Sequence, residues 1–588
     1  MSGFRGFVAA LCAGFTVAIL VAPSSGAVEG SAFVAETRSP TGIVVSDQVL
    51  ASAAGRDILR ADGNALDAAA AAIFALGVVQ PAECGLGGGV RVLYRPAKGE
   101  TIVVDGGGRA PAAATPTTIG STPGGIDAEG LGHRVVGVPG EVAGLAEALR
   151  THGTITLAEA VAPAERLARE GFAMTGDLFG QVAFGGGQEL LSRFPEAASI
   201  YLHPDGSPYT PGEVLQQPDL AWTFRQIAAH GAAAFYTGEV ASRIAAEMAK
   251  PPGAPGDEAI LTASDLARYA PVRRAPLRSN YRGATILTVP PPMAGVSVIE
   301  MLNLLEGFKL SRMGAGSAEA LHVWAEVQKI ADADIDAVLT DPAFYPVPTD
   351  RLTSQGFANQ RRRLIDPATA QTYEPGVTSG HGHGHGRNRD DATIGHTAHV
   401  SAIDSAGNAA AVTCTLGGAW GSGIVVEDTG VLLGNGLRSP DPAGHPDQIE
   451  GDKMRATAIA PTIVVKGNVP VLVLGAGGNA AIYRDVVGII SNVLDFGMDI
   501  GHAVDAERYH AYQDEAGPYV FAEDARIAPD VLEDLDDRGH VIAWAFGEYA
   551  CCPPLLGIAA AAGIDRRTGE RVGAGDVRRL GEDLAAGQ

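Results

Sequence analysis

Two threonines in the last third of the chain have side chains suited to acyl transfer. The stretches 397–404 and 409–416 alternate in the manner of β-strands and are joined by a Ser-Ala-Gly-Asn turn, so they predict a hairpin. Its register places Thr397 beside Thr415 or Leu416. A threonine hydroxyl alone is a poor nucleophile at neutral pH, but if the peptide bond before Thr397 is cut, the freed α-amine becomes a nearby base. The pair therefore indicates nucleophilic catalysis that depends on cleavage of the chain.

The elements that hold these threonines belong to a large, acidic, globular protein. The chain has 588 residues, of which 46% are hydrophobic and 19% charged, which excludes a mainly disordered protein. At about 150 residues per domain, this length allows several domains or one large layered fold. The formal net charge of −24 repels phosphate backbones, so nucleic-acid binding is disfavoured.

Residues 1–27 have the pattern of a signal peptide. Arg5 gives a positive start, residues 7–21 are almost wholly apolar, and small residues precede a cut after Ala27. A membrane anchor is the alternative, but the apolar run of about 15 residues is shorter than the roughly 20 that a bilayer-spanning helix needs. No later stretch is long and apolar enough to span. We therefore expect an exported protein, periplasmic or secreted.

The rest of the chain predicts a mixed α/β protein. Helical patterns cover 51–60, 66–76, 142–173 and most of 214–340, and strands are expected at 90–94, 102–105 and 284–289. After a segment rich in glycine and histidine at 374–396, strands are expected at 397–404, 409–416, 423–433, 459–466 and 470–475. His381, His383 and His385 in that segment could bind a metal loosely, but a solvated flexible loop is the preferred interpretation. A helix-rich first part is thus expected to meet a strand-rich last part across one loop.

Four cysteines follow the expected signal peptide: Cys84, Cys414, Cys551 and Cys552. Their spacing gives no disulfide framework, no CxxC and no Cys/His metal motif. The adjacent Cys551 and Cys552 are expected to stay reduced or to pair elsewhere rather than to bridge each other. Cysteine catalysis is therefore disfavoured, and no metal site is expected.

Several separated motifs resemble those of one known family. Near the proposed nucleophile they are Thr397-Ala398-His399-Val400-Ser401, Asp404 with Gly407-Asn408-Ala409, and Gly421-Ser422-Gly423. Elsewhere they include Asp62-Gly63-Asn64-Ala65, Gly85-Leu86-Gly87-Gly88-Gly89, Arg109-Ala110-Pro111, Pro290-Pro291-Pro292, Pro461-Thr462-Ile463-Val464 and Gly475-Ala476-Gly477-Gly478. In this order they resemble the γ-glutamyltranspeptidases, a family of N-terminal-nucleophile hydrolases, over nearly the whole chain after the expected signal peptide.

The resemblance implies a four-layer αββα sandwich and a precursor that cuts itself between His396 and Thr397. Residues 28–396 would form the large subunit and residues 397–588 the small subunit, both in one large domain. Thr397 would then attack the amide carbonyl of a small-molecule substrate.

Three further residues gain roles from the same resemblance. Thr415 would orient the nucleophile, and the backbone N–H groups of Gly477 and Gly478 would stabilise the oxyanion. Glycine suits that role because it permits a close backbone approach, although a tight turn after the strand 470–475 also explains the pair. No metal or organic cofactor is implied.

The carboxylate-binding residues of typical members are changed in this sequence. Gly107 stands where an arginine would bind the α-carboxylate of the glutamyl group, and the nearest arginine, Arg109, is a candidate for that role or a surface residue. Thr457-Ala458 replaces a pair of serines that hold the same carboxylate and keeps one hydroxyl. Thr457 is therefore a second candidate for substrate binding.

The positions that receive the α-amino group are also changed. Gly417, Gly436 and Ser439 replace an asparagine, a glutamine and an aspartate of the family pattern, and Arg438 reverses the local charge. An ammonium group needs an acidic partner when it leaves water. The acylation chemistry is thus better preserved than the γ-glutamyl pocket.

Three functions remain open at this point. The default is hydrolysis or transfer of γ-glutamyl groups from compounds such as glutathione. The alternative enzyme hydrolyses another amide, with a dicarboxylic or oxamate-like acyl group. A processed but catalytically silent binding protein is the third, although such a protein need not keep Thr397, Thr415 and the two glycines.

Overall fold

The computed structural model describes residues 36–184, 186–377, 395–514, 517–523, 526–544, 556–578 and 584–588, all within one compact unit. The expected signal peptide lies outside the described residues, as do the three histidines of segment 374–396 and the adjacent pair Cys551 and Cys552.

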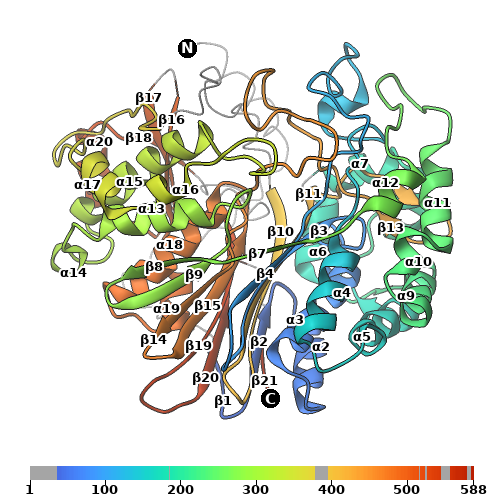
Figure 1. The fold of residues 1–588 in the computed structure, drawn as a ribbon, viewed down its shortest axis with the longest axis horizontal. Helices are drawn as coiled ribbons and strands as arrows, with labels where there is room; N and C mark the ends of the chain where they lie inside the picture. Colours follow the sequence, from blue (N-terminus) through green and yellow to red (C-terminus); the bar gives the residue numbers. More distant parts are fainter. Residues whose placement is uncertain are drawn as a thin grey trace, which may run out of the picture. The chain divides into compact units, whose positions relative to one another are not determined.

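Two seven-stranded antiparallel sheets form the centre of this unit (Figure 1). Sheet A has the order β1 (Thr37–Ser39), β20 (Arg571–Gly575), β19 (Ile558–Ile564), β15 (Val469–Gly477), β14 (Thr462–Lys466), β9 (Ala284–Thr288) and β8 (Leu277–Tyr281). Sheet B has the order β21 (Ala585–Gly587), β2 (Ile43–Ser46), β10 (Gly395–Ile403), β11 (Ala409–Gly418), β3 (Gly89–Arg95), β4 (Ile102–Gly106) and β7 (Val272–Arg274). Each sheet therefore takes strands from both sides of Thr397.

Helices cover the outer face of sheet B. Those that contact its strands are α2 (Val49–Arg60), α3 (Ala65–Val79) and α4 (Glu141–His152). Further out lie α5 (Leu157–Glu170), α6 (Gly176–Ala183), α7 (Gly187–Ser192), α8 (Pro195–Tyr201), α9 (Pro218–His230), α10 (Ala233–Tyr236), α11 (Glu239–Met248) and α12 (Ala263–Arg268). Every residue of α3 is buried, and its many alanines let it pack closely against both α2 and the strands.

A second group of helices covers the outer face of sheet A. Contacts with its strands come from α13 (Gly295–Leu305), α18 (Ala481–Leu494) and α19 (Ile500–Asp505). The others are α14 (Leu310–Met313), α15 (Ala318–Asp336), α16 (Thr349–Leu352), α17 (Gln355–Arg362) and α20 (Pro529–Asp537). A small sheet of β16 (Tyr509–Asp514), β17 (Gly517–Ala522) and β18 (Val541–Trp544) packs on α15.

Side-chain alternation along the strands creates three separate cores. On β3, Val90 and Val92 face the helices, whereas Leu93 faces sheet A and packs with Val103 of β4. The matching core on the other side joins sheet A to α13, α15 and α18. Two helical layers around two stacked sheets confirm the expected four-layer αββα sandwich.

Two sequence-based expectations about secondary structure were wrong. The stretch 423–433 is not one strand but the pair β12 (Val425–Val426) and β13 (Val431–Leu432), because Asp428 and Gly430 take positive φ angles of 55° and 64° between them. Region 214–340 contains β7 and β8 as well as the expected strand. The expected helix-rich first part and strand-rich last part do occur among the described elements, since α2–α17 precede Thr397 and only α18–α20 follow it, but the two parts share both sheets.

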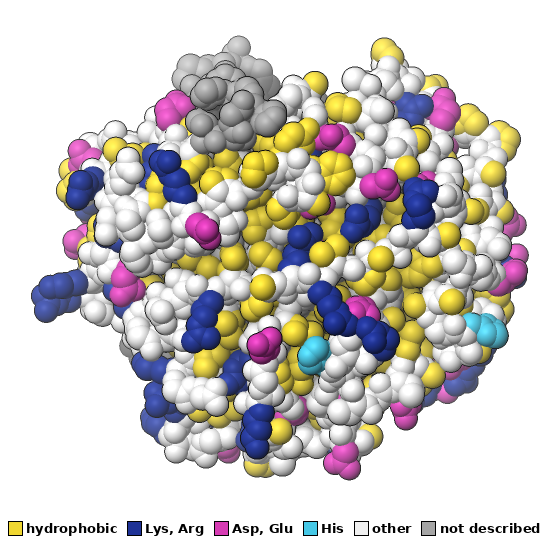
Figure 2. Space-filling model, viewed as in Figure 1, with side chains coloured by type: hydrophobic (Ala, Val, Ile, Leu, Met, Phe, Trp, Pro, Cys, Tyr) yellow, Lys and Arg dark blue, Asp and Glu magenta, His cyan; other side chains and the backbone are white. Residues whose placement is uncertain are grey.

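The remaining short elements lie outside the two large sheets. They are the 3₁₀ helix η1 (Ile126–Glu129) and the paired strands β5 (Phe172–Ala173) and β6 (Val214–Leu215). Basic side chains spread across the middle of the face shown in Figure 2, with acidic ones scattered among them, despite the acidic net charge.

Candidate active site

Thr397 lies in β10 at a break in the register of the central hairpin. From Ala398 to Ile403, β10 pairs with β11 in one register, with Ala398 opposite Cys414; His396 instead lies opposite Gly417, so the register shifts by one residue at Thr397. This β-bulge re-aims the threonine side chain. The predicted neighbour is confirmed: the Thr397 hydroxyl lies 3.2 Å from that of Thr415.

A chain of hydrogen bonds connects the two hydroxyls to the peptide bond before Thr397. The Thr397 hydroxyl donates to Thr415 Oγ1, and the Thr415 hydroxyl donates to the carbonyl oxygen of His396 at 2.9 Å. The Gly417 N–H donates to the same Thr415 oxygen at 2.9 Å. Since His396 and Thr397 are 8% and 6% exposed, this array is held in a largely dry setting.

Gly477 and Gly478 lie at the end of β15, directly against the nucleophile strand. A Cβ on Gly477 would overlap the carbonyl oxygen of Thr397 and lie 2.9 Å from its carbon, so no other residue fits there. Gly478 has a φ of 122°, which non-glycine residues rarely adopt. The tight turn and the close approach expected from the sequence therefore occur together.

A neutral histidine supports the nucleophile strand from inside the sandwich. The Ser401 hydroxyl donates to the Val473 carbonyl, so its oxygen accepts from Nε2–H of His399, and Nδ1 of His399 then accepts from Thr413 at 2.8 Å. Burial lowers the pKa of His399 to about 3. The ring stays neutral and ties β10 to both β11 and β15.

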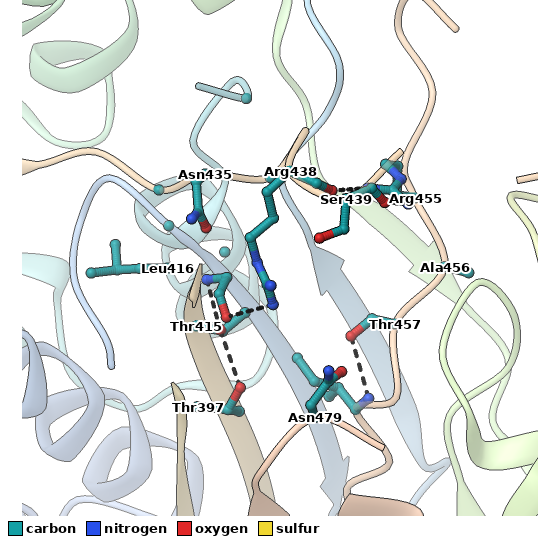
Figure 3. Close-up of a pocket in the computed structure, with 18 of the residues that line it drawn as sticks. Thr397, Thr415, Leu416, Asn435, Arg438, Ser439, Arg455, Ala456, Thr457 and Asn479 are labelled. Atoms are coloured by element: carbon teal, nitrogen blue, oxygen red, sulfur yellow. Dashed lines mark hydrogen bonds between the residues drawn. The ribbon is translucent and has the colours of Figure 1, made fainter. Parts of the chain in front are cut away.

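Thr397 and Thr415 open into a cavity of about 520 Å³ (Figure 3). Its charged lining residues, among those that the structure describes, are Arg91, Arg438, Arg455 and Asp441. Arg438 reaches from the loop after β13 toward Thr415 and donates to the Gly417 carbonyl at 3.3 Å. Arg455 donates to Asp441 at 2.8 Å, so the one acid in this lining already has a cationic partner.

Three of the positions that differ from the family pattern also line this cavity. At Gly417 the φ is 104°, and a Cβ would overlap the Asn435 side chain, whose Oδ1 accepts from the Gly418 N–H. Gly436 and Ser439 line the cavity as well. Gly417, Gly436 and Ser439 thus share one cavity, whereas Gly107 is not among its lining residues.

Thr457 and Arg109 are placed differently. Thr457 lines the cavity, and its hydroxyl oxygen accepts from the Ile459 N–H at 3.3 Å. Arg109 does not belong to the cavity lining, and its guanidinium donates to the Asp452 carbonyl in an exposed setting. The geometry thus supports a role in substrate binding for Thr457 and gives none for Arg109.

Besides Arg455, sequence reasoning missed a cavity residue that is carried by a strand, Arg91. It lies on β3 opposite Thr413, two residues beyond Gly89, which is the partner of Thr415. The sequence did contain a sign of this. Arg91 and Leu93 are two residues apart on one strand, so their side chains point to the same face, and Leu93 is apolar and buried. An arginine on that face therefore enters the interior of the sandwich.

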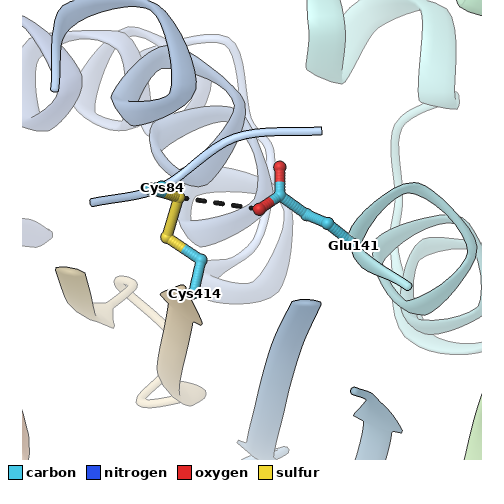
Figure 4. A group of neighbouring side chains, drawn as sticks. All are labelled: Cys84, Glu141 and Cys414. Carbon is cyan, nitrogen blue, oxygen red and sulfur yellow. Dashed lines mark hydrogen bonds between the residues drawn. A yellow bond between two sulfur atoms is a disulfide. The ribbon is translucent and has the colours of Figure 1, made fainter. Parts of the chain in front are cut away.

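A disulfide joins Cys84, in the loop after α3, to Cys414 on strand β11 of the central hairpin (Figure 4). The two cysteines are 330 positions apart in sequence, with Cys414 next to Thr415. Glu141 Oε2 lies 3.6 Å from Cys84 Sγ, and burial raises the pKa of Glu141 to about 8. Because a disulfide sulfur carries no proton, only the protonated carboxyl can donate there.

Two groups of side chains in the described part of the chain have a composition that suits metal binding. Cys84, Cys414 and Glu141 form one, but the sulfurs are joined to each other. His322, Glu326 and His540 form the other, and there the ammonium of Lys329 lies 2.6 Å from Glu326 Oε1, where it supplies the positive charge. Neither group touches the cavity of Thr397.

The αββα sandwich, with a threonine hydroxyl pair in its central hairpin and two glycines against it, is the fold and site of an N-terminal-nucleophile hydrolase. The sequence profile described as Gamma-glutamyltranspeptidase matches residues 51–586. The chain therefore belongs to the γ-glutamyltranspeptidase family, and it is an enzyme of this class, which hydrolyses or transfers acyl groups from amides.

Relatives of two kinds are similar to this chain. It is 33% identical to the glutathione hydrolase proenzyme of Escherichia coli (strain K12), over 94% of this chain and 92% of that protein. It is 35% identical to the acylase ACY 1 proenzyme of Pseudomonas sp. (strain SE83), over 85% of this chain and 87% of that protein. Its fold matches the crystal structure of cephalosporin acylase from Bacillus halodurans with a TM-score of 0.82 and 27% identity, over 97% of this chain and 99% of that one.

The helices were also compared with the dimensions of a bilayer. Within the described ranges, none is both long and apolar enough to cross a membrane.

Proposed function

We propose that the chain cuts itself between His396 and Thr397. The Thr397 hydroxyl oxygen attacks the carbonyl carbon of His396, the C–N bond breaks and the nitrogen takes up a proton, which leaves an ester between the two residues. Water then hydrolyses the ester to a His396 carboxylate and a Thr397 with free amine and hydroxyl. The hydrogen bond from Thr415 to the His396 carbonyl supports this step, because it stabilises charge that develops on that oxygen.

The released Thr397 then acts on substrate amides. Its amine accepts the hydroxyl proton, the oxygen attacks the substrate carbonyl, and the proton passes to the leaving amine as the acyl-threonine ester forms. Water or an acceptor amine releases the acyl group. The backbone N–H groups of Gly477 and Gly478 stabilise the tetrahedral intermediate in this proposal, which the close approach of Gly477 to Thr397 supports.

The acyl group favoured by this cavity carries a carboxylate and lacks an α-amine. The observation that supports this choice is the cavity lining: three arginines and one aspartate, and the aspartate is already paired with Arg455. A carboxylate gains a charge-assisted partner in such a site, whereas an ammonium would have to compete for Asp441. Glutaryl-type amides are therefore the leading substrate class, and the similarity to an acylase proenzyme supports an amide substrate other than glutathione.

Transfer of γ-glutamyl groups is the second candidate. It is favoured by the presence of Asp441 in the cavity wall and by the similarity to a glutathione hydrolase proenzyme. For this function, the ion pair between Arg455 and Asp441 would have to break so that Asp441 could bind the ammonium group of the substrate.

The experiment compares three p-nitroanilides on matured protein: glutaryl, γ-glutamyl and the uncharged butyryl donor. Thr397→Ala protein gives the blank. We expect kcat/KM to be highest for glutaryl and lowest for butyryl. A clear preference for γ-glutamyl would contradict the proposed acyl specificity and restore the plain transpeptidase interpretation.

We also propose that the chain is exported and cut after Ala27, on the basis of the pattern of residues 1–27. N-terminal sequencing of the large subunit from its native cell should then begin at Val28. A mature protein that retains Met1 would contradict export by this route.

A further inference from the structure

The side chain missing at Gly107 is replaced in space by another residue. A Cβ on Gly107 would overlap Nη2 of Arg91 and lie 2.5 Å from its Cζ and 2.9 Å from its Nη1. Gly107 is not among the glycines with positive φ, so its backbone conformation does not require glycine. The guanidinium of Arg91 is what excludes a larger side chain there.

Arg91 is held in this position by a buried acid. Its Nε lies 2.8 Å from Oδ1 of Asp105, which is fully buried, and the other carboxylate oxygen of Asp105 accepts from Arg274 Nε at 3.0 Å. The Gly107 N–H also donates to Asp105 Oδ1 at 3.1 Å. The carboxylate therefore fixes the inner edge of the Arg91 guanidinium.

The outer edge of the same guanidinium is available to a ligand. Arg91 is 5% exposed and lines the cavity of Thr397, and in the described part of the chain neither Nη1 nor Nη2 donates a hydrogen bond. A buried guanidinium with two free terminal nitrogens has the geometry that binds a carboxylate in a bidentate manner. β3 carries it about 7 Å along the strand from Gly89, the partner of Thr415.

We propose that Arg91 is the residue that binds the carboxylate of the acyl donor, supplied from β3 instead of from the position of Gly107. The inference rests on the proposed function, because it assumes an acyl group that enters this cavity. The arginine is thus supplied by the neighbouring strand, and its guanidinium lies directly against Gly107.

The test measures two donors on matured protein, glutaryl p-nitroanilide and its neutral counterpart in which the carboxylate is a carboxamide. Arg91→Gln should lower kcat/KM for the carboxylate donor by about 10- to 100-fold and leave the neutral donor nearly unchanged. Arg91→Lys keeps the positive charge but loses the pair of terminal nitrogens, so its kcat/KM for the carboxylate donor should lie between those of wild type and Arg91→Gln. Arg95→Gln is the matched control, since Arg95 is on the same strand, is equally buried at 6% exposure, and donates to Asn468 away from the cavity. Self-cleavage and the thermal midpoint of each variant report whether it folds.

Three outcomes separate the possible errors. In the first outcome, wild type prefers the carboxylate donor, and Arg91→Gln keeps this preference whereas Arg438→Gln or Arg109→Gln loses it. The assignment of Arg91 is then wrong, and the proposed function stands. If wild type prefers γ-glutamyl donors, the proposed acyl specificity is wrong. In that case a rise in KM for them in Arg91→Gln still supports the assignment of Arg91, and an unchanged KM overturns it.

Discussion

The nucleophile side of the cavity and its acyl-binding side are built in different ways. The nucleophile side consists of Thr397, Thr415 and the two glycines, which are neutral and held by strand register and backbone contacts. The side that we propose to bind the acyl group is lined by arginine side chains from β3 and from the segment between β13 and β14.

This difference explains why one side follows the family pattern and the other does not. Moving Thr397 or Gly477 would require the central hairpin or β15 to shift, because their neighbours lie in van der Waals contact. A guanidinium on a long side chain can instead enter the site from another strand, as Arg91 does beside Gly107. In this account the backbone fixes the position of the catalytic threonine and glycines. The specificity for the acyl group depends instead on long side chains, which other strands or loops can supply.

The largest effect is expected from breaking the nucleophile side. Thr397→Ala should remain a single chain and lose at least about 1000-fold in amide hydrolysis, because both the attacking oxygen and the future amine function are affected. Electrophoresis and an anilide assay measure both. Cleavage of this variant at the same bond would mean that another protease does the cutting.

The disulfide beneath the hairpin should be the next most important feature. If the chain is cut before Thr397, the bond between Cys84 and Cys414 joins the two products, so a denaturing gel without reductant should show one band and a reduced gel two. Cys84→Ser should lower the free energy of unfolding by about 2–4 kcal/mol. Two bands without reductant would show that the bond does not form in the matured protein.

A smaller effect is expected at Thr415. Thr415→Val keeps the shape but removes the donor to the His396 carbonyl, so self-cleavage should slow by about 10- to 100-fold, whereas Thr415→Ser should cleave nearly normally. The rate is followed by gel after expression at low temperature. Equal rates in the valine and serine variants would remove Thr415 from the mechanism.

The smallest effect concerns the pH dependence of stability. Glu141 has a pKa of about 8 in the folded protein against 4.5 when exposed, so the stability it contributes is complete below pH 4.5 and is lost as pH rises through 8. The thermal midpoint of wild type should therefore fall more between pH 5 and pH 8.5 than that of Glu141→Gln, by about a few degrees. Parallel pH curves for the two proteins would show that Glu141 ionises normally.

The sequence predicted the nucleophile side well because local rules govern it. Alternation and turn residues predicted the hairpin to within one residue, and only the bulge at Thr397 decided between Thr415 and Leu416. Local rules failed at 423–433, where apolar residues on both sides of a turn resembled one strand. They also missed β7, whose partner β4 is distant in sequence, and β8, which forms a tight hairpin with β9 across Arg282 and Gly283.

The acyl-binding side could be predicted only in part. The sequence showed that the arginine and the asparagine of the family pattern are absent at Gly107 and Gly417. It did not show which side chains occupy the space beside these glycines. Arg91 and Asn435 fill these positions from 16 and 18 residues away in the chain, through strand pairing and loop packing. The pairing of Cys84 with Cys414 likewise depends on the packing of the loop after α3 against β11, which spacing does not reveal.

The central claim is that this cavity selects a carboxylate without an α-amine, and direct competition tests it. Matured protein is given glutaryl and γ-glutamyl anilides at equal concentration with distinguishable leaving groups, so that the ratio of initial rates equals the ratio of kcat/KM. We expect the glutaryl donor to react at least about 10-fold faster, since it needs no acidic partner. A faster γ-glutamyl donor would contradict the account and show that Asp441 receives the ammonium group.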